Sequence, residues 1–357
     1  MQGPKGSHGG SRTRVAVMGA GSIGCYVGGW LATHHDVTLV GRSAVVDTIA
    51  DVGLTVTDID GASRTTPPSM LRLSTEASAV TGADVVLVCT KSAGTAAATG
   101  QLAPFVRRET ILISLQNGLR NAAAIESALE PCFPSRADRP LVLSGMVPFN
   151  VVRSGPAAWT QTVDGRLLLK DHPRVEGLAR SAREAGLDVG LHPDMRAVLY
   201  AKLLLNLNNA VNALSGVPLA QQLRDRDHRR VLAACQDEAL AVARAAALSP
   251  ARLTTLPPGL MPRVLRLPTP VFTALAATQL RISGSARSSM ADDVAAGRPT
   301  EIGELQGVVA ELGERYDVAT PVSHALVALV REAERAGQAG GCPHRWGGAE
   351  LRAAVGV

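Results

Sequence analysis

Residues 14 to 32, RVAVMGAGSIGCYVGGWLA, decide the fold. Arg14 to Met18 reads as a short buried strand that runs directly into a glycine-rich turn, and a helix pattern follows at once. Gly19 permits a tight turn, Gly21 lets the backbone approach a pyrophosphate, and Gly24 lets the helix pack closely on the strand. The free N–H groups at the helix start then face the phosphates. The residues predicted to bind a dinucleotide here are Gly19, Gly21, Ser22, Ile23 and Gly24.

Further strand patterns support this interpretation, because a glycine-rich turn alone is common in proteins. Asp36 to Val40 follows the helix at the distance of a β-α-β unit. Ala83 to Cys89 and Thr110 to Leu115 are apolar runs typical of buried parallel strands. The pattern predicts an N-terminal α/β domain of the Rossmann type with a doubly wound sheet.

The end of the second strand indicates which dinucleotide is bound. An NAD-binding domain needs Asp or Glu at this point, where the carboxylate accepts hydrogen bonds from the ribose hydroxyls. This chain has Gly41 and then Arg42. Gly41 leaves space for a 2′-phosphate and the Arg42 guanidinium suits it, so the sequence favours NADPH/NADP+ over NADH. The alternative is that Arg42 is a solvated loop residue.

Two later loops place polar side chains at the strand ends, which is the edge where open α/β sheets bind ligands. Lys91 comes shortly after the strand that ends at Cys89 and adds a second positive charge for the adenosine phosphate, but taken alone it is more simply an exposed loop residue. Asn117 and Gly118 follow the strand that ends at Leu115, and this pair is also common in turns. The function of both loops therefore depends on the rest of the chain.

The C-terminal half has helical patterns throughout and predicts an all-α second domain. Residues 196–215, RAVLYAKLLLNLNNAVNALS, place Lys202, Asn206 and Asn209 at i, i+4 and i+7 on one face of a helix whose other faces are apolar. Burying such polar groups costs about 1 to 3 kcal/mol each unless partners satisfy them. The stripe therefore indicates a ligand site, with a satisfied structural network as the alternative.

The length of 357 residues fits two domains, each able to bury its own core. Strands at Leu141 to Val147 and Thr160 to Leu169 complete the first of them. We expect a flexible leader at 1–12, an NADP-binding Rossmann domain at 13–193, a helical substrate domain at 194–336 and a mobile tail at 337–357.

Composition excludes several classes of function. The 36 Lys and Arg exceed the 31 Asp and Glu, but they are spread along the chain and aromatic residues make up only 3%, so we expect no nucleic-acid partner. No apolar run reaches the roughly 20 residues of a membrane helix, so we expect no membrane partner. The five cysteines have no CxxC pair and no histidine at metal-ligand spacing, which predicts a reduced, cytoplasmic protein without a metal.

Five stretches together resemble the ketopantoate reductase (2-dehydropantoate 2-reductase) family. The glycine motif is shared by many dehydrogenases, whereas Lys with Asn four residues on, and Ser-Ser-Met followed by Thr-Glu-Ile at this spacing, are more specific. The stretches span nearly all of the chain after the leader. They are VAVMGAGSIGCYVGGWLA at 15–32, TKSAG at 90–94, LQNGL at 115–119, KLLLN at 202–206 and SSMADDVAAGRPTEI at 288–302.

The resemblance implies an NADPH-dependent reduction of 2-dehydropantoate to pantoate, a step of pantothenate and coenzyme A biosynthesis. It makes Lys202 the general acid and Glu301 the residue that binds the substrate hydroxyl. It further implies that Asn117 spans cofactor and substrate, and that Asn206 and Ser289 contact the substrate. Asp293 is implied to support the same pocket, and Arg42 with Lys91 to hold the 2′-phosphate.

Elementary chemistry agrees with these implied roles. Hydride addition to a ketone creates an alkoxide, which needs a proton donor within hydrogen-bond reach, and a desolvated lysine can have a pKa lowered toward neutrality. Glu301 follows Pro299 and Thr300 at a predicted helix start, where its alternative role is to complement the helix dipole.

The chain also departs from the family pattern. Many members have a substrate asparagine followed by proline eight residues after the lysine, where this chain has Ala210 and Val211. Asn209 or Asn212 is a candidate substitute. A reductase of another 2-oxo acid or ketone therefore stays open as an alternative. A non-catalytic NADP(H)-binding regulator is a further alternative, because a fold alone does not establish activity. The proline-rich segment from Leu256 to Pro270 has no assigned role, and the oligomeric state, with a homodimer as one alternative, is open.

Overall fold

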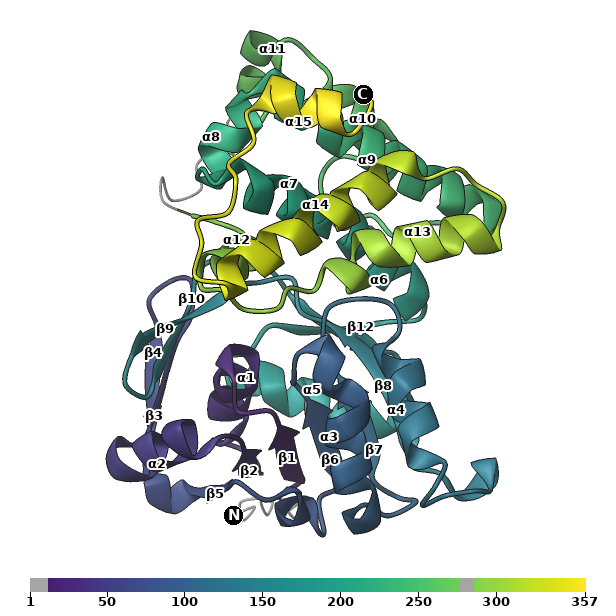
Figure 1. The fold of residues 1–357 in the computed structure, drawn as a ribbon. Coiled ribbons are helices and arrows are strands. Elements are labelled where there is room, and N and C mark those ends of the chain that lie inside the picture. Colours follow the sequence, from purple (N-terminus) through teal and green to yellow (C-terminus); the bar gives the residue numbers. More distant parts are fainter. Residues whose placement is uncertain (1–11, 277–285) are drawn as a thin grey trace, which may run out of the picture. The chain divides into compact units, whose positions relative to one another are not determined.

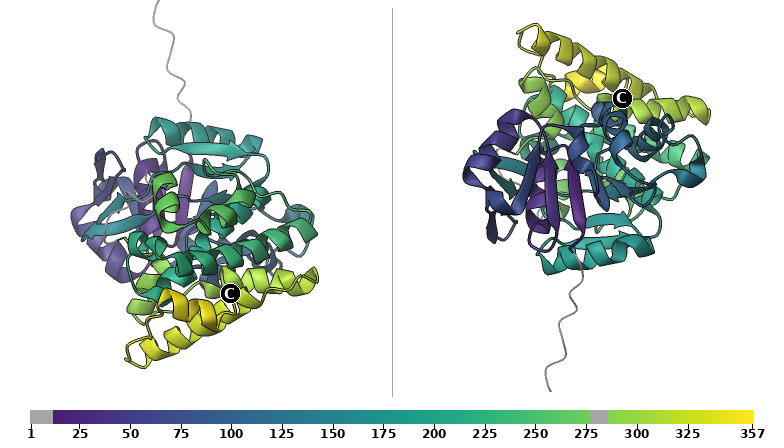
Figure 2. Two further views of the ribbon diagram at one scale, coloured as in Figure 1. Left: turned by 90° about the horizontal axis from the view of Figure 1, so that it is seen from above. Right: turned by 90° about the horizontal axis from the view of Figure 1, so that it is seen from below.

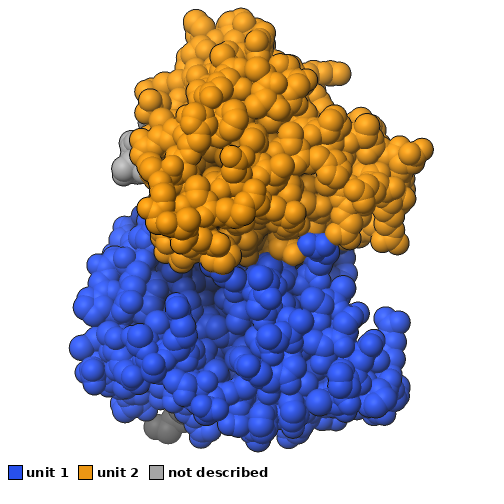
Figure 3. All heavy atoms as spheres, in the orientation of Figure 1, with its two compact units in different colours: residues 1–116, 120–195 blue, residues 117–119, 196–357 orange. Residues whose placement is uncertain are grey.

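The protein is described by a computed structural model that covers residues 12–276 and 286–357. It divides into two compact units (Figure 3). Unit 1 comprises residues 1–116 and 120–195, and unit 2 comprises residues 117–119 and 196–357. The division lies beside the boundary expected at 193/194, except that the short segment 117–119 belongs with the C-terminal unit.

An eight-stranded sheet forms the centre of unit 1 (Figure 1), and the view from below in Figure 2 shows its strands side by side. Every neighbouring pair is parallel except β8 with β11. In spatial order the strands are β12 (Val189–His192), β11 (Leu167–Lys170), β8 (Leu141–Met146), β7 (Ile111–Ser114), β6 (Val85–Val88), β1 (Arg14–Met18), β2 (Asp36–Val40) and β5 (Leu71–Ser74).

The central strands are apolar along their whole length because both faces of the sheet are covered. In β1, Val15 and Val17 pack into the core shared with α1 (Ser22–Leu31) and α5 (Pro173–Glu184). Ala16 and Met18 point to the opposite face, where α3 (Thr95–Leu102) and α4 (Asn121–Leu129) lie. This alternation in a doubly covered sheet confirms the predicted α/β fold.

Strand order places a switch point at β1. The chain runs outward from β1 through β2 and then returns to β6 on the other side of β1. In open α/β sheets, ligands bind at the carboxyl ends of the strands next to such a point. The glycine-rich turn follows β1 at this position.

A second sheet of four strands, which the sequence patterns had not predicted, covers the α1 side. Its order is β4 (Ser63–Thr66), β3 (Leu54–Thr57), β10 (Ala158–Gln161) and β9 (Val151–Gly155). The single strand expected from Thr160 to Leu169 is therefore wrong, because β10 ends at Gln161 and β11 belongs to the other sheet. A turn stabilised by Asp58, whose carboxylate accepts from the N–H groups of Asp60 and Ala62, joins β3 to β4.

Unit 2 consists of helices around one apolar core, as predicted for an all-α domain. The longest, α9, is central, and its buried face includes Val231, Cys235 and Ala239. Among the described residues of this unit, the α-helices are α6 (Met195–Asn206), α7 (Asn208–Ser215), α8 (Leu219–Arg224), α9 (Arg226–Ala245), α10 (Met261–Leu265), α11 (Thr269–Leu275), α12 (Ser289–Ala295), α13 (Gln306–Arg315), α14 (Pro321–Gln338) and α15 (Gly348–Ala354).

The predicted single helix over 196–215 is interrupted at Leu207, which separates α6 from α7. Two buried side chains donate to carbonyls at this point and just before it. Gln236 donates to Leu204 O at 3.0 Å, and Gln306 donates to Leu207 O at 2.8 Å. Insertion of side chains beside the backbone ladder is a recognised cause of such breaks.

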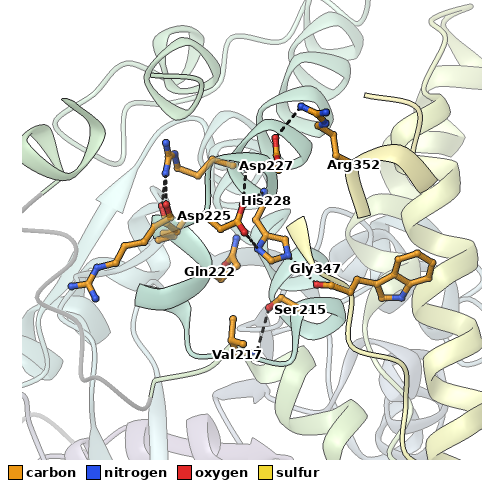
Figure 4. Close-up of polar contacts among 12 residues, drawn as sticks. Ser215, Val217, Gln222, Asp225, Asp227, His228, Gly347 and Arg352 are labelled. Atoms are coloured by element: carbon orange, nitrogen blue, oxygen red, sulfur yellow. Dashed lines mark hydrogen bonds and ion pairs between the residues drawn. The ribbon is translucent and has the colours of Figure 1, made fainter. Parts of the chain in front are cut away.

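The C-terminal segment is packed on unit 2 rather than being the mobile tail expected from residue 337 (Figure 4). Helix α15 contributes Leu351, which is fully buried, to the apolar core. Trp346 N–H donates to Leu214 O at 2.9 Å, and its carbonyl accepts from His228 Nε2 at 3.1 Å. Arg352 pairs with Asp227 at 2.9 Å. Residue 12 of the expected leader is also ordered, and residues 1–11 lie outside the described part of the chain.

Candidate functional site

The turn after β1 shows why its first glycine is required. Gly19 has φ +111°, a backbone conformation that residues with a Cβ rarely adopt. A Cβ there would lie 2.8 Å from the carbonyl carbon of Cys89 and 2.8 Å from the nitrogen of Thr90. The turn is therefore packed directly against the end of β6.

The other two glycines differ in what surrounds them. A Cβ on Gly24 would lie 2.2 Å from Gly19 O, so Gly24 allows α1 to pack against the turn. A Cβ on Gly21 would meet nothing within 4 Å, and Gly21 is exposed at the start of α1. No side chain caps this helix end. The first backbone N–H groups of α1, from Ser22 and Ile23, thus begin a helix beside open space, which is the arrangement that binds phosphate.

The end of β2 fits a dinucleotide with a 2′-phosphate. Gly41 packs against Ala20, and a Cβ at Gly41 would lie 2.5 Å from Ala20 Cβ, so this position has no room for a carboxylate side chain. Arg42 is exposed and precedes α2 (Ser43–Val52), and Lys91 is exposed just after β6. Because β2 and β6 flank β1, the two cations lie at strand ends on either side of the glycine turn. These residues fit NADPH.

A buried hydrogen-bond network fixes the loops after β6 and β7. Gln116 Nε2 donates to Thr90 O at 2.9 Å and to Thr95 Oγ1 at 2.6 Å. Gln116 Oε1 accepts from Ser114 at 3.1 Å, and the hydroxyl of Thr95 lies 2.8 Å from Asn121 Oδ1. The network holds the backbone directly before Lys91 and directly before Asn117. Lys91 and Asn117 therefore follow rigid backbone.

In unit 2, Lys202 lies on α6 and is followed by two buried leucines. Leu203 and Leu204 are 2% exposed, and Lys202 itself is half-buried. Burial lowers the pKa of Lys202 from its ordinary value to about 8. An ammonium with such a pKa releases its proton far more readily near neutral pH than an exposed lysine.

Asn117 and Glu301, which are 184 positions apart in sequence, meet within unit 2. Asn117 Nδ2 donates to Glu301 Oε2 at 3.2 Å. Glu301 directly precedes the 3-10 helix η7 (Ile302–Glu304), whose last N–H donates to Glu301 O at 2.9 Å. The carboxylate therefore lies before a single tight turn and not at the start of an α-helix, because α13 begins only at Gln306.

Helix α12 carries the other predicted residues of this stretch. Ser289 is exposed at its first position, and Asp293 is nearly buried and pairs with Arg298 at 2.9 Å. The preceding residue, Ser288, caps the helix by accepting from Ala291 N–H, and its own N–H donates to Asn212 Oδ1 at 2.9 Å. Asn212 thus joins α7 to the start of α12.

The polar stripe on 196–215 is only partly as predicted. Lys202 and Asn206 share α6, but Asn209 lies beyond the break, on α7. Asn209 is half-buried, and its carbonyl accepts from Ser288 Oγ at 3.3 Å. Asn212 is fully buried and both ends of its amide are engaged, so it does not substitute for the missing family asparagine.

Sequence models of one protein family match residues in both units. A sequence model described as "Ketopantoate reductase PanE/ApbA" matches residues 15–174, and one described as "Ketopantoate reductase PanE/ApbA C terminal" matches residues 194–334. This chain belongs to the ketopantoate reductase family. Members of the family are NADP-dependent oxidoreductases that act on a 2-oxo acid, which confirms the enzyme class and the cofactor predicted from the sequence.

Relatives of this family member extend over nearly its whole length. A 2-dehydropantoate 2-reductase of Halobacterium salinarum is 32% identical over 91% of this chain and 100% of its own length. One from Mesorhizobium japonicum is 27% identical over 89% of this chain and 97% of its own. The crystal structure of a family ketopantoate reductase from Ralstonia eutropha is 30% identical, covers 91% of this chain and 100% of its own, and has a TM-score of 0.77.

The same fold occurs in a D-mandelate dehydrogenase solved with NADH and anilino(oxo)acetate, which is 21% identical with a TM-score of 0.72 over 91% of this chain and 99% of its own. At this level of identity the similarity concerns the fold alone. Among the residues described for this reductase family member, no helix is both long and apolar enough to cross a membrane.

Three buried glutamines of this family member had no predicted role, and their hydrogen bonds support the backbone near the predicted residues. Gln116, Gln236 and Gln306 are at most 7% exposed and donate to backbone or side-chain oxygens near the predicted residues. A signal was available for Gln236, which is polar but occupies a helical stripe with Leu232, Ala239 and Leu240. A polar residue within such a stripe needs a partner, and its sequence spacing does not show which one.

Proposed function

We propose that this protein reduces 2-dehydropantoate to pantoate with NADPH, with Lys202 as the proton donor. The proposal rests on the family assignment and on one observation in unit 2, the hydrogen bond of 3.2 Å from Asn117 to Glu301. The family resemblance implies that both residues contact the substrate. The two residues lie far apart in the sequence and are hydrogen-bonded in the fold.

The chemistry assigned to the chain's residues is proton transfer and orientation. NADPH, when bound, supplies the hydride to C2 of the ketone. The Lys202 ammonium gives its proton to the carbonyl oxygen as negative charge develops there, and the neutral amine then regains a proton from solvent. A lysine whose pKa burial lowers to about 8 suits this role.

The remaining predicted residues are proposed to orient the substrate. Glu301 accepts from the substrate hydroxyl, and the amide of Asn117 fixes that carboxylate by donating to Oε2. Asn206, Asn209 and Ser289 are proposed as further substrate contacts. Asp293, held by Arg298, supports the start of the segment that leads to Glu301. Arg42 and Lys91 are proposed to bind the 2′-phosphate of the cofactor.

A second candidate keeps this mechanism and changes the substrate to another 2-oxo acid. The observation that favours it is the pair Ala210 and Val211, both fully buried at the positions of the family asparagine and proline. Asn212 is engaged elsewhere. A panel of 2-oxo acids, ranked by kcat/KM with NADPH, separates the two candidates.

Replacement of Lys202 tests the mechanism. We expect Lys202→Ala to lower kcat by about 10² to 10⁴, the usual contribution of a positioned acid, while NADPH binding measured by fluorescence titration is retained. Lys170→Ala, which removes a partly exposed lysine of unit 1 that donates to Pro193 O, is the control and should keep wild-type turnover. Turnover by Lys202→Ala at the wild-type rate would refute the assignment. A wild-type protein that binds NADPH and reduces no 2-oxo acid would instead be a binding-only regulator.

The proposal also covers compartment and assembly. The five cysteines are free thiols, and Cys25 and Cys235 are buried, which suits a reducing compartment such as the cytoplasm. A homodimer stays a prediction, which sedimentation of the purified protein at several concentrations tests.

A further inference from the structure

Gln306 is a fully buried polar side chain at the first position of α13. Its Nε2 donates to Leu207 O at 2.8 Å, across 99 positions of sequence. Its Nε2 also lies 3.9 Å from Cys235 Sγ. Burying an amide among apolar helices is unfavourable unless its hydrogen bonds are made, so the bond to Leu207 is the reason the side chain is tolerated here.

The two ends of this hydrogen bond belong to the two elements that carry the proposed chemistry. Leu207 directly follows the last residue of α6, the helix of Lys202, and precedes α7. Gln306 begins α13 five positions after Glu301. The hydrogen bond from Gln306 to Leu207 therefore connects the end of α6, which carries Lys202, to the segment that carries Glu301. Both elements belong to unit 2.

The connection from Gln306 back to Glu301 is short and hydrogen-bonded throughout. Glu304 N–H donates to Glu301 O at 2.9 Å, and Leu305 N–H donates to Ile302 O at 3.3 Å. On the other side of Glu301, the N–H of Thr300 donates to Glu334 Oε1 at 2.6 Å. The Glu301 turn is thus held at one end by α14 and at the other by Gln306.

Gln236 provides an internal comparison for this bond. It lies on α9, is also buried, and also donates from Nε2 to a backbone carbonyl, in this case Leu204 O of α6 at 3.0 Å. Oε1 of both glutamines lacks a hydrogen-bond partner among the residues that the structure describes. Replacing either glutamine with Met therefore removes one donated bond of the same kind, but only Gln306 is linked to the Glu301 turn.

We propose that Gln306 is a positioning residue of the reaction, which sets the placement of Glu301 relative to the helix of Lys202. The inference rests on the proposed function of these two residues. Gln306 touches neither substrate nor cofactor in this scheme, and its effect passes through the turn at 301–305. A displacement of about 1 Å in a reacting constellation can lower the rate by about 10²-fold.

The test compares Gln306→Met with Gln236→Met in the full chain. We expect both variants to lower the melting temperature, because each leaves a buried carbonyl without its donor. Only Gln306→Met should lower kcat/KM for the 2-oxo acid, by about 10- to 100-fold, and shift the midpoint of the pH profile of kcat. Only Gln306→Met should also speed hydrogen–deuterium exchange of the amides at 301–306. If Gln306→Met does not fold, the comparison uses Gln306→Asn and Gln236→Asn instead. In these variants the side chain is shorter by one methylene, so the amide no longer reaches the carbonyl.

Equal losses of kcat/KM in the two variants, or unchanged exchange at 301–306 in the Gln306 variant, would overturn the inference. Failure of the proposed function gives a different result, a wild-type protein that reduces no 2-oxo acid. In that event the exchange comparison still accepts or rejects Gln306 as the residue that holds the Glu301 turn.

Discussion

Lys202 shows how one residue acquires a chemical property from its neighbours. It is half-buried on α6, and this burial disfavours the charged ammonium. The result is a pKa of about 8 in place of the ordinary value for lysine. Lys202 therefore changes its protonation state in the mildly alkaline range, where enzyme kinetics are easily measured.

We expect the two directions of the reaction to depend on pH with opposite signs. Ketone reduction needs protonated Lys202, so its kcat should fall as pH rises through about 8. Oxidation of the hydroxy acid with NADP+ needs the neutral amine as base, so its kcat should rise over the same range. Steady-state kinetics in both directions across this range measure the effect. A forward kcat that stays constant well above pH 8 would contradict the assignment of Lys202.

The glycines of the turn after β1 predict contrasting variants. Gly24→Ala should destabilise the fold, because its Cβ would lie 2.2 Å from Gly19 O. Gly21→Ala should leave stability nearly unchanged, since its Cβ would meet nothing within 4 Å, but should weaken NADPH binding because the new methyl occupies the space that the pyrophosphate approaches. Urea denaturation and cofactor titration of both variants measure the difference. Equal cofactor affinity in Gly21→Ala and wild type would argue against phosphate binding at this turn.

At the scale of elements, a single arginine organises the proline-rich segment that the sequence left without a role. This segment forms α10 and leads into α11. Arg229 of α9 is fully buried and donates to Leu265 O at 3.0 Å and to Leu267 O at 2.8 Å. Its guanidinium also lies 4.3 Å from the ring centroid of Phe272. Backbone carbonyls around one guanidinium thus fix the segment against α9.

We expect Arg229→Met to destabilise unit 2 by roughly 2 to 4 kcal/mol, because buried carbonyls lose their donor. The neighbouring Arg230, which is partly exposed and pairs with Asp227 at 3.5 Å, is the control. Arg230→Met should cost less than about 1 kcal/mol. Urea unfolding curves of the two variants give the comparison, and equal stability losses would show that the carbonyl contacts of Arg229 contribute little.

Elements buried on both faces were predictable from sequence, and elements set by distant contacts were not. Strands β1 and β2 were predicted at their observed bounds because their apolar runs are bounded by turn residues. The hairpin of β3 and β4 was missed although Leu54 and Val56 alternate with threonines and Asp60-Gly61 is a turn pair. The alternation and the turn pair are together a signal for this hairpin in the sequence.

In the candidate site too, local spacing was predictable from the sequence and long-range contacts were not. The spacing of Lys202 and Asn206 on one helix was predictable, because four residues return a helix to the same face. The break at Leu207 was not, since Gln306, which donates to its carbonyl, lies 99 positions away. The contact between Asn117 and Glu301 spans 184 positions, and only the family resemblance pointed to both residues.

At the scale of the whole molecule, each unit has its own apolar core, and the C-terminal segment completes the core of unit 2. Leu351 of α15 and Val355, which directly follows that helix, pack into the same core as Leu204, Val231 and Val309. The sequence pattern after residue 337 is rich in glycine, which made a mobile tail the natural expectation. The short apolar face of α15 overrides that composition by burying Leu351 completely.

We expect Leu351→Ala to lower the free energy of unfolding by about 2 to 5 kcal/mol, as for other buried leucines. Arg352→Ala, which removes a partly exposed ion pair with Asp227, should cost less than about 1 kcal/mol. Thermal and urea unfolding measure both, and truncation after residue 338 should be at least as damaging as Leu351→Ala. A truncated protein with wild-type stability would show that the segment is dispensable.

The contact between Gly41 and Ala20 limits how this enzyme's coenzyme preference can change by mutation. A switch to NADH calls for an acidic side chain at the end of β2, yet any Cβ at position 41 would collide with Ala20 Cβ at 2.5 Å. A single replacement there damages the turn before it recruits the new coenzyme. A carboxylate at position 41 therefore also requires Ala20→Gly, which removes the colliding methyl group. A change of preference to NADH at this position thus requires two substitutions together.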